Sequence, residues 1–124
     1  MKKAHADVVS HLVSNLKVFC FDIDGVICSN TWGEYTKAKP ILKAIKKINQ
    51  LYDYGNTIIL FTARFMGKNN ESETKAYAEG YEFTCKQLDN WGVKYHKLKM
   101  GKPSYDIIID DKHFNYNDDW INSL

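Results

Sequence analysis

Three short apolar runs constrain the fold of this chain more than any other feature of its sequence. They cover residues 17–22 (KVFCFD), 57–62 (TIILFT) and 105–110 (YDIIID), and each ends in a polar or acidic residue. Runs of this kind are typical of strands buried on both faces of a parallel sheet. Because helical patterns separate the runs, we expect strands and helices to alternate with right-handed crossovers. The predicted fold class is α/β, a parallel sheet flanked by helices.

Two amphipathic patterns supply the predicted helices. The first covers residues 40–55, beginning with a proline and ending with a glycine, as helices often do. The second follows a polar segment at residues 67–70 and continues to about residue 91, although Gly80 weakens its middle. Residues 93–98 are half polar and predict an additional edge strand.

The length of the chain limits it to one domain. With 124 residues, 44% of them hydrophobic, it can bury a substantial core without disulfides, and it has no room for a second domain. Residues 1–16 carry apolar side chains at helical spacing and predict a short amphipathic arm. We therefore treat residues 1–124 as a single domain with an N-terminal helical arm.

Charge and cysteine content exclude several classes of protein. The 17 basic and 15 acidic residues nearly balance, and the lysines are spread along the chain, which argues against nucleic-acid binding. No apolar run approaches the roughly 20 residues of a membrane span, so we expect no membrane partner. The three cysteines include no close pair, which favours reduced thiols in a cytoplasmic protein.

Chemically active side chains stand where the apolar runs begin or end, and open α/β sheets bind ligands at the carboxyl ends of their strands. They are Asp22, Asp24, Thr62, Lys102, Asp110 and Asp111. Four carboxylates cannot all remain ionised side by side unless a cation offsets their repulsion. Hard oxygen ligands suit Mg²⁺, which also takes phosphate oxygens. The pattern predicts a magnesium site that handles a phosphate group.

Each signal also has a simpler interpretation when it is taken alone. The Asp22–Gly25 stretch is compatible with an acidic turn, and Thr62 with an ordinary strand end. Lys102 is one of many lysines, and Asp110 with Asp111 is compatible with the polar start of a loop. The position of every signal at the end or opening of a predicted strand favours a shared site.

The same residues, in the same order, resemble the four motifs of the haloacid dehalogenase (HAD) superfamily. The resemblance covers about residues 17–113. The stretches DIDGVICS, FTAR and GKPSYDIIIDDK are similar to those of small HAD phosphatases of capsular or surface polysaccharide biosynthesis. The aspartate at position 24 resembles the phosphatase pattern of the superfamily rather than its dehalogenase pattern, which implies phosphate esters as substrates.

This resemblance implies a mechanism and a cofactor. Asp22 would attack phosphorus and form an aspartyl-phosphate, and Asp24 would act as general acid and then general base. Thr62 would hydrogen-bond the phosphoryl group, and Lys102 would neutralise its charge. Mg²⁺ would be held by Asp22, the backbone carbonyl of Asp24, and Asp110. Two roles stay open for Asp111, as a further metal ligand or as the residue that orients Lys102.

Three further residues are candidates for binding the substrate. Arg64, the only arginine, either binds a substrate anion through two hydrogen bonds or forms a structural salt bridge. Thr31 and Trp32 lie in the loop that follows the first run, where family members carry a flap over the site. Trp32 either stacks on a sugar or packs within the loop. Cys20 is expected in the core.

The spacing of the motifs leaves no room for the cap domain that many HAD phosphatases insert. The segments 24–62 and 62–102 are each too short for an independent domain and its connections. We therefore expect an open site, a small phosphorylated sugar or related metabolite as substrate, and a homo-oligomer in which a neighbouring subunit covers the site. Two alternatives remain, a non-catalytic HAD-like binding protein and a receiver-like phospho-acceptor module, whose motifs normally run in another order.

Overall fold

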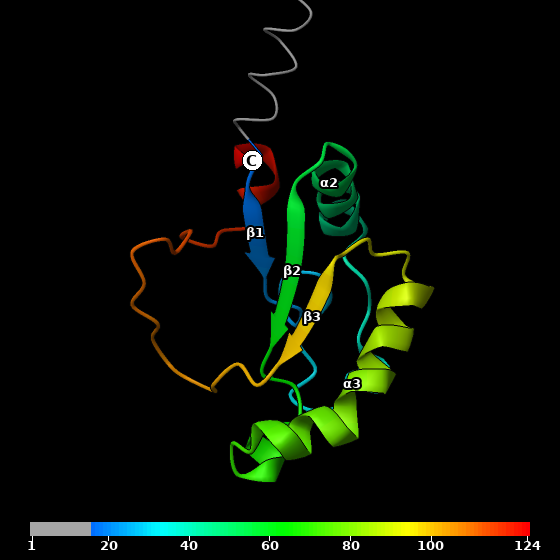
Figure 1. Cartoon of the computed structure of the whole chain (residues 1–124), viewed down its shortest axis with the longest axis vertical. Coiled ribbons are helices and arrows are strands. Elements are labelled where there is room, and N and C mark those ends of the chain that lie inside the picture. The colour runs from blue at the N-terminus through cyan, green and yellow to red at the C-terminus, as the bar shows by residue number, and fades with distance from the viewer. Residues whose placement is uncertain (1–15) are drawn as a thin grey trace, which may run out of the picture.

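A three-stranded parallel sheet forms the centre of the molecule. The computed structural model describes residues 16–124, so the arm predicted over residues 1–16 lies almost entirely outside the described residues. The strands are β1 (Val18–Phe21), β2 (Thr57–Thr62) and β3 (Lys97–Met100), in the order β1-β2-β3 (Figure 1). The predicted α/β class is confirmed.

Two α-helices supply the crossovers between these parallel strands. Helix α2 (Leu42–Asp53) joins β1 to β2, and helix α3 (Glu73–Asn90) joins β2 to β3. Helix α2 buries Ala44, Ile45 and Ile48, whose spacing places them on one face of the helix. Both helices lie close to their predicted positions because their apolar side chains recur with the helical period.

Three short 3₁₀ helices complete the regular structure of residues 16–124. They are η1 (Tyr35–Lys37), η2 (Gly67–Asn69) and η3 (Trp120–Ser123). Trp120 of η3 is buried, and its ring centroid lies 5.5 Å from that of Phe21 in β1. The carboxyl-terminal turn is therefore fixed to the core beside β1 (Figure 1).

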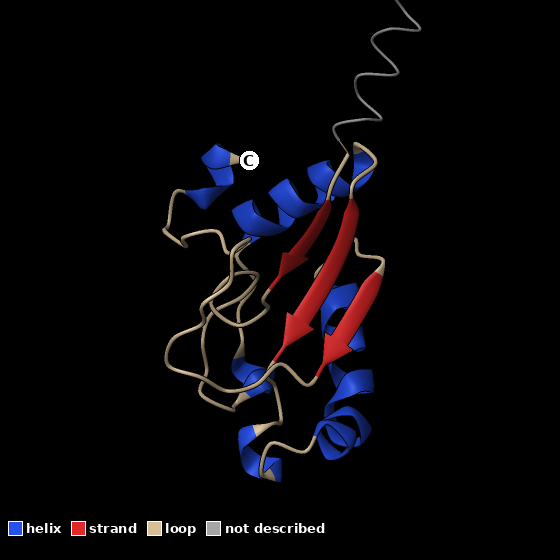
Figure 2. Cartoon of the chain, turned by 60° about the vertical axis from the view of Figure 1, so that its left-hand side comes forward, coloured by secondary structure: helices blue, strands red, loops and turns tan. Residues whose placement is uncertain are grey.

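The sheet is packed on one face and open on the other. Ile58, Leu60 and Thr62 alternate along β2 and are all buried, whereas Val18 of β1 is 65% exposed and Cys20 is also exposed. The helices lie behind the strands in Figure 2, on a single side of the sheet. The expectation that β1 is buried on both faces is therefore wrong, and so is the placement of Cys20 in the core. An apolar run shows that burial is favourable, but it does not show how many layers of structure cover it.

The prediction of a strand over residues 105–110 is also wrong. Within residues 16–124 this segment has no regular secondary structure, and the exposed fractions of Ile107 and Ile109 are 81% and 95%. Residues on either side of the segment are hydrogen-bonded to other loops. Ser104 bonds the carboxylate of Glu71, and the Tyr116 hydroxyl donates to the carbonyl of Gly25. The segment therefore runs as an exposed loop (Figure 1).

The edge strand predicted at residues 93–98 exists, but it begins later. Strand β3 covers Lys97–Met100, and Lys97 and Leu98 pair with Ile59 and Leu60 of β2. Side chains take part in holding the backbone before β3. Asn49 of α2 accepts from the Lys94 N–H, and the His96 ring accepts from the Ile58 N–H while the His96 N–H donates to the Ile58 carbonyl. These side-chain bonds replace ladder bonds and delay the start of the strand.

Candidate active site

The carboxyl ends of the three strands bring together the first group of predicted site residues. Asp22 directly follows β1, Thr62 ends β2, and Lys102 lies two residues beyond β3. The Lys102 backbone N–H donates to the Thr62 carbonyl at 3.1 Å, and the Lys102 Nζ lies 3.3 Å from Oδ2 of Asp22. The structure thus places a carboxylate, a hydroxyl and an ammonium group from three strand ends at one edge of the sheet.

Burial shapes the electrostatics of the Asp22–Lys102 pair. It raises the pKa of Asp22 above its ordinary value, and the Lys102 charge and the Ile23 backbone N–H offset this only in part. For Lys102 burial acts in the opposite direction, but Asp22 and Tyr105 together raise its pKa above its ordinary value. Lys102 therefore remains a cation at neutral pH beside a carboxylate that is partly exposed to water.

Thr62 is fully buried at the end of β2. Its Oγ1 accepts a hydrogen bond from the Arg64 backbone N–H at 3.1 Å, which orients the side chain. A hydroxyl carries a donor as well as acceptor lone pairs, so this bond leaves the proton of Thr62 available. The residue can donate one hydrogen bond to an anion at this edge of the sheet.

Arg64 forms a structural salt bridge, which is one of the two roles that the sequence predicts for it. Its guanidinium is 1% exposed and bonds Asp24 twice, through Nε to Oδ2 at 2.9 Å and through Nη2 to Oδ1 at 3.0 Å. The remaining terminal nitrogen, Nη1, donates to Oε1 of Gln87 at 2.7 Å, and the guanidinium carbon lies 4.7 Å from the centre of the Tyr35 ring. The substrate-binding role predicted for Arg64 is wrong, because its donors are already used inside the protein.

Both carboxylate oxygens of Asp24 are committed to this buried network. Besides the two bonds from Arg64, Oδ1 accepts from the thiol of Cys28 at 3.5 Å. Burial, reinforced by the charge of Asp24, raises the pKa of Cys28 to about 12, so the thiol keeps its proton. These bonds hold the carboxylate of Asp24 in one orientation. Asp24 is two residues beyond Asp22 in the loop that follows β1.

The sequence did not point to three partners in this network, namely Cys28, Tyr35 and Gln87. Gln87 lies in α3, and its Nε2 donates to the Tyr35 carbonyl at 2.7 Å. Nothing in the local pattern distinguishes these residues from ordinary loop and helix positions. The chain has a single arginine, and if it is buried its N–H groups need acceptors. Looking for such acceptors in the sequence is how Gln87 could have been found.

Asp110 and Asp111 do not reach this edge of the sheet. Both lie in the exposed loop, where Asp110 Oδ1 accepts from the Lys112 backbone N–H at 2.9 Å. This bond, supported by neighbouring Asp111, lowers the pKa of Asp110. Their expected position depended on a strand over residues 105–110, and that strand is not formed.

The four carboxylates that were predicted to hold a magnesium ion are not gathered in one place. The carboxylate of Asp22 faces Lys102 and that of Asp24 faces Arg64, so each already has a cationic partner. No group of three or more metal-ligating His, Cys, Asp or Glu side chains is gathered among residues 16–124. One guanidinium group and one ammonium group therefore lie next to the carboxylates of Asp24 and Asp22.

The loop after β1 presents Trp32 to solvent. Its side chain is 91% exposed and its backbone has a φ of 51°, which is unusual for a bulky residue. The packing interpretation of Trp32 is wrong, which leaves the ring available to a ligand. Neighbouring Thr31 has a buried Oγ1 with no hydrogen-bond partner in residues 16–124.

The three cysteines, all within the described residues, are free thiols.

Among residues 16–124, every helix is too short or too polar to cross a bilayer. His96 has a packing role, since its Nδ1 accepts from the Ile58 backbone N–H and its ring centroid lies 4.5 Å from that of Tyr52.

Comparisons with known proteins identify the fold and nothing finer. No family model and no curated protein matches the chain. A crystal structure of a target protein from Vibrio cholerae is similar to it, with a TM-score of 0.74 and 23% sequence identity. The similarity covers 87% of this chain and 95% of that one. The chain therefore has a single, compact α/β domain of a kind already seen in a solved structure.

Proposed function

We propose that this protein is a phosphomonoester hydrolase that uses Asp22 as its nucleophile. The observation that carries the proposal is the Asp22–Lys102 pair, 3.3 Å apart at the carboxyl edge of a parallel sheet, with Thr62 ending the neighbouring strand. A cation beside a half-buried carboxylate attracts a phosphate dianion to the group that attacks it. The motif resemblance to HAD phosphatases supports the same assignment.

The reaction has two displacements at phosphorus. An Asp22 carboxylate oxygen attacks phosphorus, the bond to the leaving oxygen breaks, and that oxygen takes a proton from Asp24, which has to enter this step in its protonated form. Water then attacks the aspartyl-phosphate while Asp24 takes a proton from it, which releases phosphate and restores Asp22. Because Arg64 donates to both oxygens of Asp24, one of these two bonds must break before that oxygen can bind the proton that Asp24 transfers.

Lys102 and Thr62 supply positioning and charge stabilisation in both displacements. Lys102 neutralises charge on the phosphoryl oxygens, and the free proton of Thr62 donates a hydrogen bond to one of them. Both are fixed before substrate arrives, since the Lys102 backbone is bonded to the Thr62 carbonyl. Groups fixed in this way need no reorganisation during the reaction.

The magnesium requirement stays a prediction of the resemblance. Its ligands would be Asp22, the Asp24 carbonyl and Asp110, with Asp111 as an additional ligand or as a partner of Lys102. This set requires the loop that carries Asp110 to move toward β1. We expect phosphate release to be lost in excess EDTA and restored by Mg²⁺. Full activity in EDTA would show that the two cationic side chains suffice.

The function itself is tested by a phosphate-release screen over phosphorylated sugars, sugar acids, polyols and amino alcohols with Mg²⁺ present. The proposal predicts turnover of at least one ester by the wild-type chain. Absence of release across the panel would favour the non-catalytic binding protein. Stable phosphorylation of Asp22 by acetyl phosphate without turnover would favour the receiver-like module.

For the substrate and assembly we propose a small phosphorylated sugar or related metabolite of surface polysaccharide synthesis, and a cytoplasmic homo-oligomer. Support comes from the exposed Trp32 and from the open sheet face around Val18 and Cys20, which a second copy could cover. Light scattering at high micromolar concentration is expected to give a multiple of 14.4 kDa. The mass of one chain at that concentration would contradict the oligomer.

A further inference from the structure

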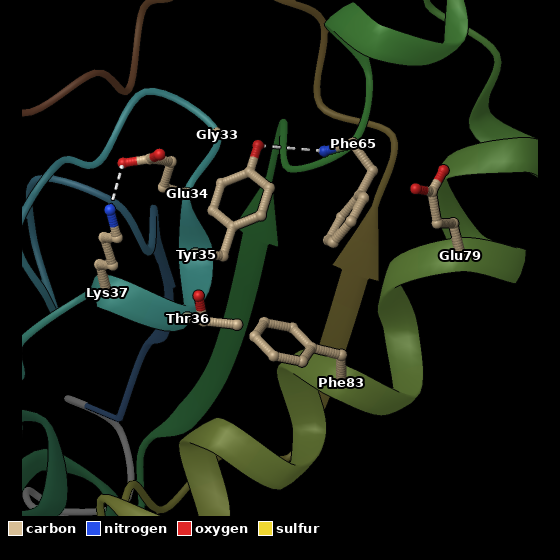
Figure 3. A pocket seen from close by; sticks show the side chains of 8 residues that line it. All are labelled: Gly33, Glu34, Tyr35, Thr36, Lys37, Phe65, Glu79 and Phe83. Atoms are coloured by element: carbon tan, nitrogen blue, oxygen red, sulfur yellow. Dashed lines mark hydrogen bonds and ion pairs between the residues drawn. The ribbon is translucent and has the colours of Figure 1, made fainter.

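A cavity of about 400 Å³ lies between the loop after β1 and helix α3 (Figure 3). Three aromatic rings wall it. The centroids of Tyr35 and Phe65 are 4.8 Å apart with the rings tilted by 47°, and Phe83 meets Phe65 edge-on at 6.4 Å. Tilted and edge-on arrangements are those that pairs of aromatic rings prefer, so the three rings form one packed apolar wall.

Phe65 is held in this wall against its own backbone preference. Its φ is 67°, a left-handed value that is rare for an aromatic residue. The Phe65 N–H donates to the Tyr35 hydroxyl at 3.2 Å, and its carbonyl accepts from Asn69 Nδ2 at 2.7 Å. Strained residues fixed by their surroundings concentrate at binding and catalytic sites.

Helix α3 makes room for the Phe65 ring at Gly80. A Cβ atom at this position would lie 2.1 Å from the ring, closer than atoms can approach. Glycine in the middle of a helix is otherwise unfavourable, by roughly 1 kcal/mol relative to alanine. The glycine that weakens the helical pattern is thus explained by the ring packed against it.

The rim of the cavity offers acceptor oxygens without a free charge. Glu34 pairs with Lys37 at 3.3 Å, and Glu79 is bonded by Lys68 and Asn69. A charged ligand group would find both carboxylates already neutralised, whereas a hydroxyl can still donate to them. Aromatic walls with acceptors at the rim fit a neutral ring with hydroxyls at its edge.

The cavity wall is joined directly to the site at the strand ends. The Tyr35 ring that lines the cavity also lies against the Arg64 guanidinium, which holds Asp24. The Tyr35 carbonyl is bonded by Gln87, the residue that also accepts from Arg64. Cavity and candidate nucleophile loop are therefore parts of one connected network.

We propose that this cavity is the subsite for the leaving group and binds the neutral, hydroxylated ring of a phosphate ester, such as a sugar ring. The inference rests on the proposed function and names the part of the substrate that the cavity selects. The apolar face of the ring lies against Tyr35, Phe65 and Phe83, and its hydroxyls donate to the rim carboxylates. Phe83 is the residue that determines this specificity.

The test compares two alkyl phosphates whose leaving oxygens have similar basicity, cyclohexyl phosphate and ethyl phosphate. We expect wild-type kcat/KM to favour the ring ester by about 10-fold, the effect of one good aromatic contact. Phe83→Trp, which fills the cavity, is expected to remove this preference by raising KM for the ring ester. Phe83→Leu, which removes an aromatic wall, is expected to reduce it too, and circular dichroism checks that each variant folds.

Tyr77→Trp is the matched control, because Tyr77 lies on the same helix, is 54% exposed and stays outside the cavity. The control should keep the wild-type ratio of kcat/KM for the two esters. Equal use of both esters by the wild type, or an unchanged ratio in folded Phe83 variants, overturns the inference and leaves the proposed function standing. Failure of the wild type to release phosphate from either ester rejects the proposed function, and the inference with it.

Discussion

Replacing Asp22 with asparagine is expected to lower phosphate release by about 10⁴-fold or more, because the amide cannot act as the nucleophile. The fold should survive. Asp22 pairs with Lys102 at a partly exposed position, where an ion pair contributes at most about 1 kcal/mol. Burial already disfavours its charged form, as its raised pKa shows. Phosphate release and thermal unfolding of the same preparation measure the two effects.

The matched control is Asp53→Asn. Asp53 is an exposed carboxylate at the end of α2 that pairs with Lys94 at 2.8 Å, so the change removes one charge from an ion pair away from the strand ends. It should leave turnover unchanged. Turnover of Asp22→Asn close to that of the wild type would show that another group attacks phosphorus.

The second large effect is expected from Arg64→Met, which removes the cation from a buried ion pair. We expect a loss of about 3–5 kcal/mol in the free energy of unfolding, because Asp24 is left without its partner. Gln87 and Tyr35 also lose their contact with the guanidinium. Urea denaturation followed by circular dichroism measures the change.

Lys94→Met provides the comparison for Arg64→Met, since it breaks an ion pair that is exposed on both sides. Its expected cost is below about 1 kcal/mol. The double variant Asp24→Asn with Arg64→Met should recover part of the loss, because the unpaired charge is then gone. A loss for Arg64→Met as small as that of Lys94→Met would mean that the Asp24–Arg64 pair does not hold the loop after β1.

Much of the architecture could be predicted from the sequence, because it depends on local periodicity. Strand β2 occupies the predicted residues, and helices α2 and α3 lie where apolar side chains recur with the helical period. The meeting of Asp22 and Thr62 followed from one rule of parallel sheets, that carboxyl ends share an edge. Lys102 was expected before a strand over residues 105–110, but it lies at the same edge because it follows β3.

The features that could not be predicted depend on partners distant in the sequence. Residues 105–110 have the composition of a buried strand, but only a neighbouring strand would make them one. Cys20 is exposed because the described structure packs helices on a single face of the sheet. The role of Arg64 depended on Asp24, 40 positions away, and on Gln87 in α3. In each case the residue type favours a certain structure or degree of burial. Whether it forms depends on residues that are distant in the sequence and close in the fold.

Arg64 is the only arginine in the chain and is 1% exposed. Cleavage at this residue can therefore be used to measure how often the surrounding structure opens. A protease specific for arginine has a single peptide bond to cut, next to a residue whose side chain is enclosed by Asp24, Tyr35 and Gln87. Cleavage there needs the network to come apart. Its rate therefore follows the population of opened molecules, without any added label.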